Sequence, residues 1–524
     1  MFNFKALILV CVVFFTFSFS TFAMETIEVS EDITSIKALL VELGEDDAVK
    51  LAESYALKHH QVELLEDLAS TYLYGKYGQS VDVEKGIFFL KYAVQQKSGK
   101  AASTLAEIYL QGAITTRSCE EGLMYANLAK ESGDKAAYTI LAQEYDLGRC
   151  VSKNQEYSVE LLNLGVKANS PSALTLLGIW HLYEINVSKD LEKAFNLFTQ
   201  AAKLGQCTAQ KNLGAMYTNG VYAATDMEKA FQIYSKSVAE GCSESLTDLA
   251  SLYYNGKVVK QDFNKAYSLY YQGMLNGSIL AKSMVAHGLL EGVGTKRNVK
   301  KGTALLIEAA EQGDSNSQYV LSVMYYNGKY LNEDLEKSRY FAKLSAEQLD
   351  PYGLSWLGYH YEYGYGGDMN LEEAERYYQL SLSQSAFSRE RLSSWYIEGK
   401  HYEKNHVAAL FLLEEGVENG DDEVVAKLGE LLSCSANKEV RDGTRAQKLI
   451  ESRMKDREYF DIKLEITLAA AYAEQDNFDK AILIMKRLES KITQEVADGY
   501  LSNKRLQQLK EITNKYLNHQ PCRI

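Results

Sequence analysis

Apolar residues along this chain recur at a spacing of 36 residues. The clearest marker is a Leu followed four positions later by a Tyr, and it occurs at Leu68/Tyr72, Leu105/Tyr109, Leu141/Tyr145, Leu213/Tyr217, Leu249/Tyr253, Leu321/Tyr325, Leu357/Tyr361 and Leu392/Tyr396. From Tyr109 to Tyr361 the step is always 36 residues, with His181 and Leu289 standing at the Tyr position. Self-similarity at this period predicts an array of stacked units rather than one large core.

Each repeat carries two helical patterns. In residues 206–241, small or apolar residues share one face of a first helix and then one face of a second, namely Ala209, Leu213, Gly214 and Tyr217, followed by Ala230, Ile233, Tyr234 and Val238. Asn219-Gly220 predicts the end of the first helix, and Asp226 can cap the second.

Capping residues recur at both helix starts. Eleven positions before the marker Tyr stand Ser98, Asp134, Ser170, Ser278, Asp314, Asp350, Ser385 and Asp421. Nine positions after it stand Ser118, Asn154, Asp190, Asp226, Asp262, Asn298, Asp334, Asn370 and Asn405. Side chains of this kind accept hydrogen bonds from free backbone N–H groups, so we expect each to stabilise its helix by about 1 kcal/mol.

Small residues recur where the two helices of a repeat should cross. Three positions before the marker stand Ala106, Ala142, Gly178, Gly214, Ala250, Ala286, Ser322, Gly358, Ser393 and Gly429, and a second small column runs through the start of each second helix. Small residues allow a close approach, and aromatic side chains such as Tyr217 and Tyr234 then fill the space between repeats. These columns predict an all-α protein, a right-handed α-solenoid of stacked helix-turn-helix repeats.

The motif small-x-x-x-Leu-Gly-x-x-Tyr-x-x-Gly, followed by Asp-x-x-Lys-Ala, resembles the Sel-one-like repeat family, a relative of the tetratricopeptide repeat. The resemblance extends from residue 64 to about 458. It implies a non-enzymatic adaptor, since members of that family hold protein partners in membrane-associated complexes, in cell-envelope assembly and at host contacts.

Four segments follow from these patterns. Residues 1–23 resemble a signal peptide, residues 24–63 should form N-terminal capping helices, residues 64–458 hold eleven repeats, and residues 459–524 hold a tetratricopeptide-like repeat and a C-terminal capping helix. In the second of these, Ile33–Leu43 and Ala48–Leu57 have helical spacing, and in the last we expect the final helix over 494–517.

The first segment predicts export. Lys5 supplies a positive start, Ala6 to Phe17 an apolar core, and Thr21-Phe22-Ala23 a cleavage site, so the mature chain would begin at Met24. The alternative is an uncleaved anchor, because the segment is only just long enough to span a bilayer. We expect a periplasmic or secreted bacterial protein with no transmembrane segment after cleavage. Its net charge of −14 disfavours nucleic acid as a partner.

Seven cysteines occur, and no two form a Cys-x-x-Cys pair, which disfavours zinc binding and thioredoxin-like chemistry. An exported chain can form disulfides. Cys119 and Cys150 fall in the helix connections of neighbouring repeats and are a candidate disulfide. Cys207 and Cys242 stand at nearly equivalent points one repeat apart, and we expect that distance to exceed the ~7 Å limit between bonded Cα atoms.

Motifs of catalysis are missing from the sequence. It contains no Gly-x-Ser-x-Gly, no His-Glu-x-x-His and no phosphate loop. Ser132-x-x-Lys135 and Ser435-x-x-Lys438 match a nucleophile motif of penicillin-binding enzymes, but the Lys-Thr-Gly that completes such a site is absent. His401 and His406 share one connection without enough further ligands for a metal. We predict no enzyme activity, no catalytic residue, no metal and no cofactor; the alternative is an enzyme or small-molecule-binding protein, for example one related to the cell wall or to β-lactams.

One stripe of the first helices lies away from the core columns, at nine, six and two positions before the marker and two after it. The stripe is polar in most repeats but is aromatic around Tyr361. There, together with neighbouring residues, it predicts a protein-binding surface made of Tyr326, Tyr352, Trp356, Tyr359, Tyr363 and Tyr365. The alternative is that these rings pack between repeats, as many of the 37 tyrosines should.

Overall fold

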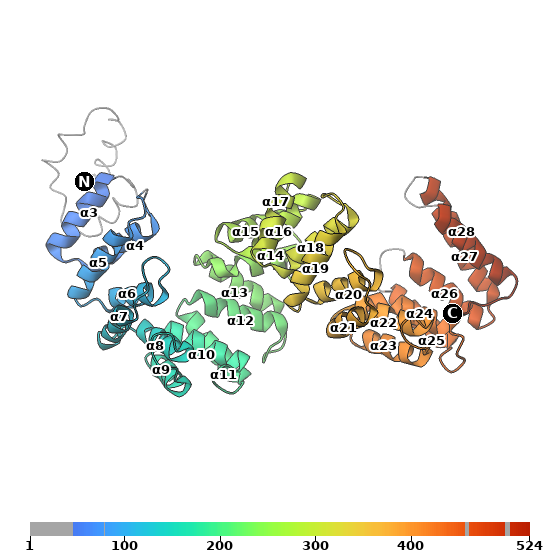
Figure 1. Cartoon of the computed structure of the whole chain (residues 1–524), viewed down its shortest axis with the longest axis horizontal. Coiled ribbons are helices and arrows are strands. Elements are labelled where there is room, and N and C mark those ends of the chain that lie inside the picture. Colours follow the sequence, from blue (N-terminus) through green and yellow to red (C-terminus); the bar gives the residue numbers. More distant parts are fainter. Residues whose placement is uncertain (1–45, 78, 456–460, 498–502) are drawn as a thin grey trace, which may run out of the picture. The chain divides into compact units, whose positions relative to one another are not determined.

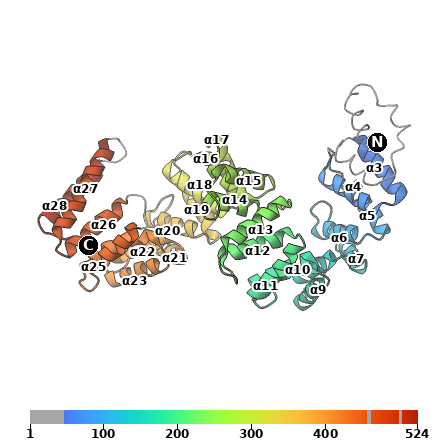
Figure 2. The same cartoon turned by 180° about the vertical axis from the view of Figure 1, so that it is seen from behind.

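The computed structural model describes residues 46–77, 79–455, 461–497 and 503–524. Within these ranges it consists of 26 α-helices and two 3-10 helices, with no β-strand. Helices consecutive in the sequence pack against each other in pairs (Figures 1 and 2). The predicted all-α solenoid is thereby confirmed. The predicted signal peptide and Ile33–Leu43 lie outside the described residues.

The chain forms two compact units, and α14 (Leu246–Asn255) contributes to both. The first unit comprises residues up to 252 together with 256–260. Its helices are α3 (Asp46–His59), α4 (Val62–Tyr74), α5 (Val83–Gln95), α6 (Gly99–Gln111), α7 (Cys119–Glu131), α8 (Ala136–Leu147), α9 (Gln155–Lys167), α10 (Pro171–Tyr183), α11 (Leu191–Lys203), α12 (Cys207–Asn219), α13 (Met227–Ala239) and η1 (Ser243–Ser245).

The second unit comprises 253–255 and 261–524. Its helices are α15 (Phe263–Leu275), α16 (Ile279–Glu291), α17 (Val299–Glu311), α18 (Ser315–Asn327), α19 (Leu335–Glu347), α20 (Pro351–Tyr363), α21 (Leu371–Ser381), α22 (Ala386–Glu398), α23 (His406–Glu418), η2 (Asp422–Val424), α24 (Val425–Cys434), α25 (Gly443–Lys455), α26 (Ile462–Glu474), α27 (Phe478–Ala497) and α28 (Asn503–Leu517). The expected final helix over 494–517 is wrong in its start, because 494–497 end α27 and α28 begins at Asn503.

Side-chain caps start most of these helices. All nine predicted second-helix caps accept a hydrogen bond from the backbone N–H three residues on. Six of the eight first-helix caps do the same. The exceptions are Asp134, where α8 begins only after Lys135, and Asp421, which precedes the 3-10 turn η2.

The small columns lie at the helix crossings. A Cβ placed on Gly214 would lie 2.4 Å from Cε1 of Tyr234, and one on Gly358 would lie 2.8 Å from Cε1 of Tyr378. Both tyrosines are buried. Each glycine therefore makes room for an aromatic ring of the second helix in its own repeat.

Neighbouring repeats meet where their first helices begin. The first residue of one such helix contacts the capping position of the next, as in Ser315 Oγ, 3.3 Å from Asp350 Oδ2. Cys207 and Cys242 occupy these two positions and form a disulfide with Cα atoms 5.3 Å apart. The expectation that they are too distant was wrong, because it used the separation of whole repeats and not that of these helix starts. Cys119 and Cys150 are also bonded.

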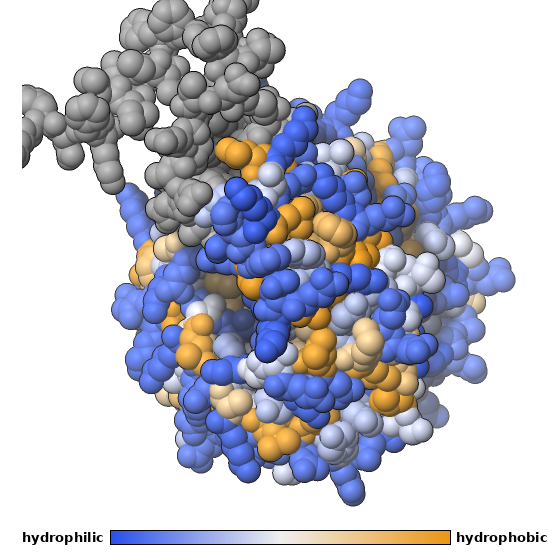
Figure 3. All heavy atoms as spheres, turned by 90° about the vertical axis from the view of Figure 1, so that its left-hand side faces the viewer, coloured by the Kyte–Doolittle hydropathy of each residue, from blue (hydrophilic) through white to orange (hydrophobic). Residues whose placement is uncertain are grey.

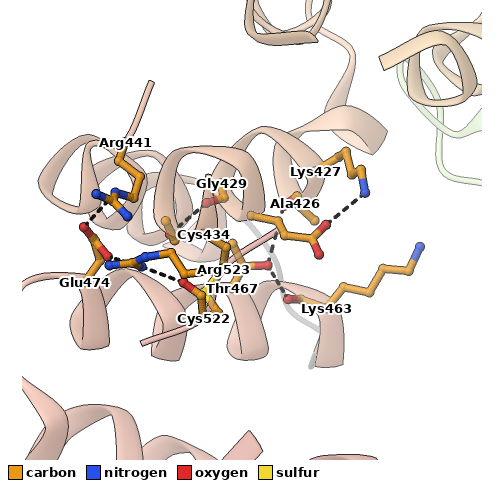
Figure 4. Close-up of a disulfide and its surroundings, with 12 residues drawn as sticks. Ala426, Lys427, Gly429, Cys434, Arg441, Lys463, Thr467, Glu474, Cys522 and Arg523 are labelled. Atoms are coloured by element: carbon orange, nitrogen blue, oxygen red, sulfur yellow. Dashed lines mark hydrogen bonds and ion pairs between the residues drawn. A yellow bond between two sulfur atoms is a disulfide. The ribbon is translucent and has the colours of Figure 1, made fainter. Parts of the chain in front are cut away.

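A third disulfide, Cys434–Cys522, was not foreseen (Figure 4). It joins the end of α24 to the segment after α28, and the backbone N–H of Ile524 donates to the carbonyl oxygen of Cys434 at 2.8 Å. Glu474 of α26 lies between Arg441 and Arg523, at 3.2 and 2.6 Å. Residues 522–524 are therefore attached to both α24 and α26.

One face of the molecule is seen in Figure 3, and there separate apolar residues are scattered among hydrophilic ones. Among the described residues, no helix is both long enough and apolar enough to cross a membrane.

Candidate functional site

Five of the six aromatic residues predicted from the sequence form one cluster. The ring of Tyr326, on α18, lies 5.1 Å from that of Trp356, on α20, and 5.2 Å from that of Tyr365, in the following connection. Tyr359 stacks on Trp356 at 5.1 Å and approaches Tyr363 to 4.8 Å. The helical spacing of α20 and the adjacent position of α18 bring these rings together. We call Tyr326, Trp356, Tyr359, Tyr363 and Tyr365 the aromatic cluster.

Partial exposure distinguishes the aromatic cluster from ordinary core. Tyr363 is 42% exposed, and the other four side chains are half-buried. The rings of Tyr326, Tyr359 and Tyr365 contact one another, with centroids 6.1 Å apart for Tyr326 and Tyr359, 5.2 Å for Tyr326 and Tyr365, and 5.7 Å for Tyr359 and Tyr365. Burial raises the pKa of Tyr326 and of Tyr359, so both phenols stay neutral at physiological pH. The cluster thus offers uncharged rings with polar tips, which is the character of interface anchors.

His360 closes the cluster from the core side. It is fully buried, with Nε2 3.0 Å from Ser338 Oγ and Nδ1 3.1 Å from the carbonyl oxygen of Tyr365. Burial lowers its pKa to about 4, and the charge of Arg339 acts in the same direction. The imidazole is therefore neutral at physiological pH and holds the Tyr365 backbone in place by a hydrogen bond.

Glu362, next to Tyr363 in α20, is the centre of an ion network beside the aromatic cluster. Its buried carboxylate accepts hydrogen bonds from Tyr378 Oη at 2.8 Å, Trp395 Nε1 at 2.9 Å, Lys400 Nζ at 2.7 Å and Arg391 Nε at 3.0 Å. Burial alone would raise its pKa, but these donors outweigh burial and lower it to about 2. Arg391 also donates to the hydroxyl of Tyr363 at 2.8 Å, so this ion network orients the most exposed ring.

Tyr352 lies apart from the aromatic cluster. Its ring contacts Tyr319 of α18 at 5.5 Å and is 60% exposed.

Three residues at the site were not predicted from the sequence. They are Tyr319, His360 and Phe387 of α22, and the ring of Phe387 lies 5.8 Å from that of Tyr359. The signal for Phe387 was available, because it stands nine positions before Tyr396, in the stripe of the next repeat.

Besides Ser338 and His360, a second Ser–His pair bears on the alternative of an enzyme. Ser435 Oγ lies 2.6 Å from His406 Nδ1, which resembles a nucleophile and its base. Both residues are buried, and neither lines one of the four cavities whose lining is described in this structure. Their hydrogen bond joins the start of α23 to the segment after α24.

The described residues contain one group of side chains close enough together to hold a metal ion, Cys207, Cys242 and Glu244. Its two sulfur atoms are joined in the disulfide. They are therefore not available as thiolate ligands.

Comparison with known proteins gives a family match. The model of the Sel1 repeat matches ten segments: 65–98, 100–134, 135–170, 171–206, 208–242, 243–278, 281–314, 315–348, 351–385 and 386–421. The eleventh repeat expected from the sequence, up to residue 458, forms the helix pair α24 and α25 but lies outside these matches.

Several solved structures are similar to this chain. A protective antigen of uropathogenic Escherichia coli that displays an SLR fold has 22% identity and a TM-score of 0.46, covering 83% of this chain and 94% of that one. A Sel1 repeat protein from Oxalobacter formigenes has 22% identity and a TM-score of 0.42, covering 47% and 99%. Yeast Tom70 has 12% identity and a TM-score of 0.32, covering 88% and 96%. A comparison with curated proteins gave no match.

Proposed function

The chain belongs to the Sel1 repeat family, and from that premise we propose that it is a non-enzymatic scaffold which binds protein partners through the aromatic cluster. Repeats of this type generally mediate contacts between proteins. The observation that supports this particular surface is the partial exposure of five adjoining rings on α18, α20 and the connection after α20. Tyr and Trp side chains supply a large share of the binding energy at protein interfaces.

The ion network around Glu362 favours the same proposal. An exposed tyrosine normally loses conformational freedom when it is bound, and that loss opposes binding. Tyr363 is already oriented by its hydrogen bond from Arg391, and the ammonium of Lys400 lies 4.8 Å from its ring centre. The ring is thus preorganised for a partner.

We further propose that the protein acts outside the cytoplasm, in the cell envelope or beyond it. Two observations support export: the signal-like pattern of residues 1–23, and the pairing in disulfides of all six cysteines among the described residues. Disulfides persist in oxidising compartments and are rare in the cytosol. N-terminal sequencing of the native protein should find Met24 as the first residue. A soluble cytosolic protein that retains residues 2–5 would contradict export.

A double substitution tests the binding surface. Tyr359→Ala with Tyr363→Ala should abolish capture of crosslinked partners from an envelope extract, quantified by mass spectrometry, and should leave the protein folded. The matched control is Lys211→Ala with Asn219→Ala, at stripe positions of α12. Unchanged capture by the tyrosine variant would place the partner elsewhere, and a collapsed thermal melt would show that these rings are core.

A further inference from the structure

A cavity of about 370 Å³ opens between α16 and α18, and α18 also carries Tyr326 of the aromatic cluster. It is lined by residues of α14, α16, α17 and α18 and by Lys329 and Tyr330 of the connection after α18. Leu290, Leu306 and Met324 are buried and form its apolar floor, while Glu291 and Lys329 are exposed at its mouth. Its volume lies at the small end of the range for ligand pockets.

The cavity occupies the same stripe of the first helices as the aromatic cluster. His287 and Val323 both stand two positions before the marker, as Tyr359 does. Tyr319 lines the cavity and also contacts Tyr352 of α20 at 5.5 Å. An extended segment that follows the stripe from α20 to α16 would therefore cross the cavity.

Positive charge gathers at one side of the mouth. Lys329 Nζ and the Tyr330 hydroxyl both contact one oxygen of Glu291, at 3.0 and 3.1 Å. Arg297 stacks on the Tyr330 ring at 5.4 Å and donates to its hydroxyl at 3.2 Å. No ion pair joins Arg297 to a carboxylate in the part of the chain that the structure describes. One acid thus faces two cations.

The sequence around Arg297 is locally basic. Residues 291–301 contain four basic side chains against one acidic one, in a chain whose net charge is −14. The negative net charge of the whole chain does not show that this segment is basic. A ligand that suits the site carries an apolar group for the floor and a negative charge for the rim.

We propose that the cavity receives one large apolar side chain (Leu, Phe or Trp) of an extended partner peptide, and that an acidic residue beside it pairs with Lys329 and Arg297. This inference rests on the proposed function, because it assigns a partner chemistry to the stripe that carries the aromatic cluster. A peptide fits better than a lipid, because the cavity holds about one bulky group and its neighbours along the stripe are tyrosines with polar tips.

Fluorescein-labelled peptides with the core Ser-Asp-X-Asp-Ser test the proposal by fluorescence anisotropy. Peptides with X as Leu, Phe or Trp should bind the intact protein, and the best of them should bind about tenfold or more tightly than the peptide with X as Ala. Replacing both Asp with Lys should weaken binding about threefold or more. Equal binding of the Ala and apolar peptides, or no binding of any peptide, would overturn the proposal.

Two variants localise the binding. Val323→Trp should fill the cavity and abolish binding, whereas Ala215→Trp, at the same position of α12, should leave it unchanged. Lys329→Glu with Arg297→Glu should reverse the preference, so that the Lys peptide binds better than the Asp peptide. Thermal melts identify any variant that fails to fold, and the charge reversal remains decisive if Val323→Trp does not fold. A charge reversal without effect on the preference would overturn the proposal.

The outcomes separate this inference from the proposed function. If the cavity variants keep full partner capture and the aromatic double variant loses it, the stripe binds protein but the cavity does not take part. If dodecanoate binds at the cavity and the peptides do not, the occupant is an amphipathic small molecule and the peptide assignment is wrong.

Discussion

The repeat that contains α12 and the repeat that contains α20 have the same core and different stripes. Leu213 and Leu357 are both buried, and Gly214 and Gly358 both lie against a buried tyrosine of the second helix. Their stripes differ, with Thr208, Lys211, Ala215 and Asn219 in the first and Tyr352, Ser355, Tyr359 and Tyr363 in the second. Positions that contact the neighbouring helix keep the fold, so the stripe can change its chemistry without changing the fold.

The difference extends to the position just after the marker, which is half-buried in α12 and buried in α20. In α12 this position is Thr218, whose hydroxyl donates to the carbonyl oxygen of Gly214 in the same helix at 3.0 Å. In α20 it is Glu362, which bonds Tyr378 and also Arg391 and Lys400 of the following repeat. A local hydrogen bond has thus been replaced by an ion network that spans two repeats and reaches the aromatic cluster.

The largest expected effect comes from this position. Glu362→Ala should lower the free energy of unfolding by about 3 kcal/mol or more, because it leaves the charges of Arg391 and Lys400 without their partner. Thr218→Ala removes one neutral hydrogen bond and should cost about 1 kcal/mol. Urea denaturation measures both. Equal losses would mean that the ion network of Glu362 adds no more stability than the single hydrogen bond of Thr218.

The glycines should behave alike in the two repeats. Gly214→Leu and Gly358→Leu each force a side chain into the ring of Tyr234 or Tyr378, and each should destabilise the protein by about 1–3 kcal/mol. Thermal melts of the two single variants give the comparison. A glycine variant that melts like the wild type would show that the crossing can widen, and the two cores would then differ after all.

Acid should affect the α20 repeat through His360, whose counterpart in α12 is Met216. The pKa of His360 falls from 6.5 to about 4 on folding. Below pH 6.5 the unfolded chain binds a proton that the folded one does not, so the stability from this group is lost as pH falls from 6.5 to 4. Between pH 7 and pH 5 the loss should be roughly 1–2 kcal/mol.

His360→Met should remove this component of the pH dependence, as measured by urea denaturation at the two pH values. Loss of the same stability between pH 7 and pH 5 in the variant would assign the pH dependence to other groups.

The smallest effects are expected on the stripes themselves. Lys211→Ala should change the free energy of unfolding by less than about 0.5 kcal/mol, since its side chain is exposed. Tyr363→Ala should cost no more than about 1 kcal/mol, because it loses one hydrogen bond from Arg391 at a partly exposed site. A loss above 2 kcal/mol for Tyr363 would make it part of the core and remove the contrast between the two stripes.

Periodic features of the fold could be read from the sequence because each is set within one repeat. The caps of the second helices and the small residue at each crossing depend on contacts a few residues away, and repetition makes them visible. Where a cap prediction failed, the local sequence had changed the start of the helix, as at Asp421, where a 3-10 turn comes first.

Contacts between repeats were harder to predict. The Cys207–Cys242 bond depends on how closely two helix starts approach, and the Cys434–Cys522 bond on where a segment without the repeat pattern packs. In the site, the helical spacing of α20 gave Trp356, Tyr359 and Tyr363, but the separation of Tyr352 follows from the direction of its ring toward Tyr319. The cavity was missed because its lining combines residues of α14, α16, α17 and α18, and none of these helices looks unusual by itself in the sequence.

The attachment of residues 522–524 to α24 has a consequence for how this end of the solenoid comes apart. A linear repeat array frays from its ends, because the terminal helix has a neighbour on one side only. Here the crosslink encloses the segment between Cys434 and Cys522, which are 88 residues apart, so α25 to α28 can melt only as a closed ring. In a chain-entropy view such a ring has far fewer melted configurations than a free tail, a difference of about 4–5 kcal/mol. Fraying should therefore be suppressed at these helices.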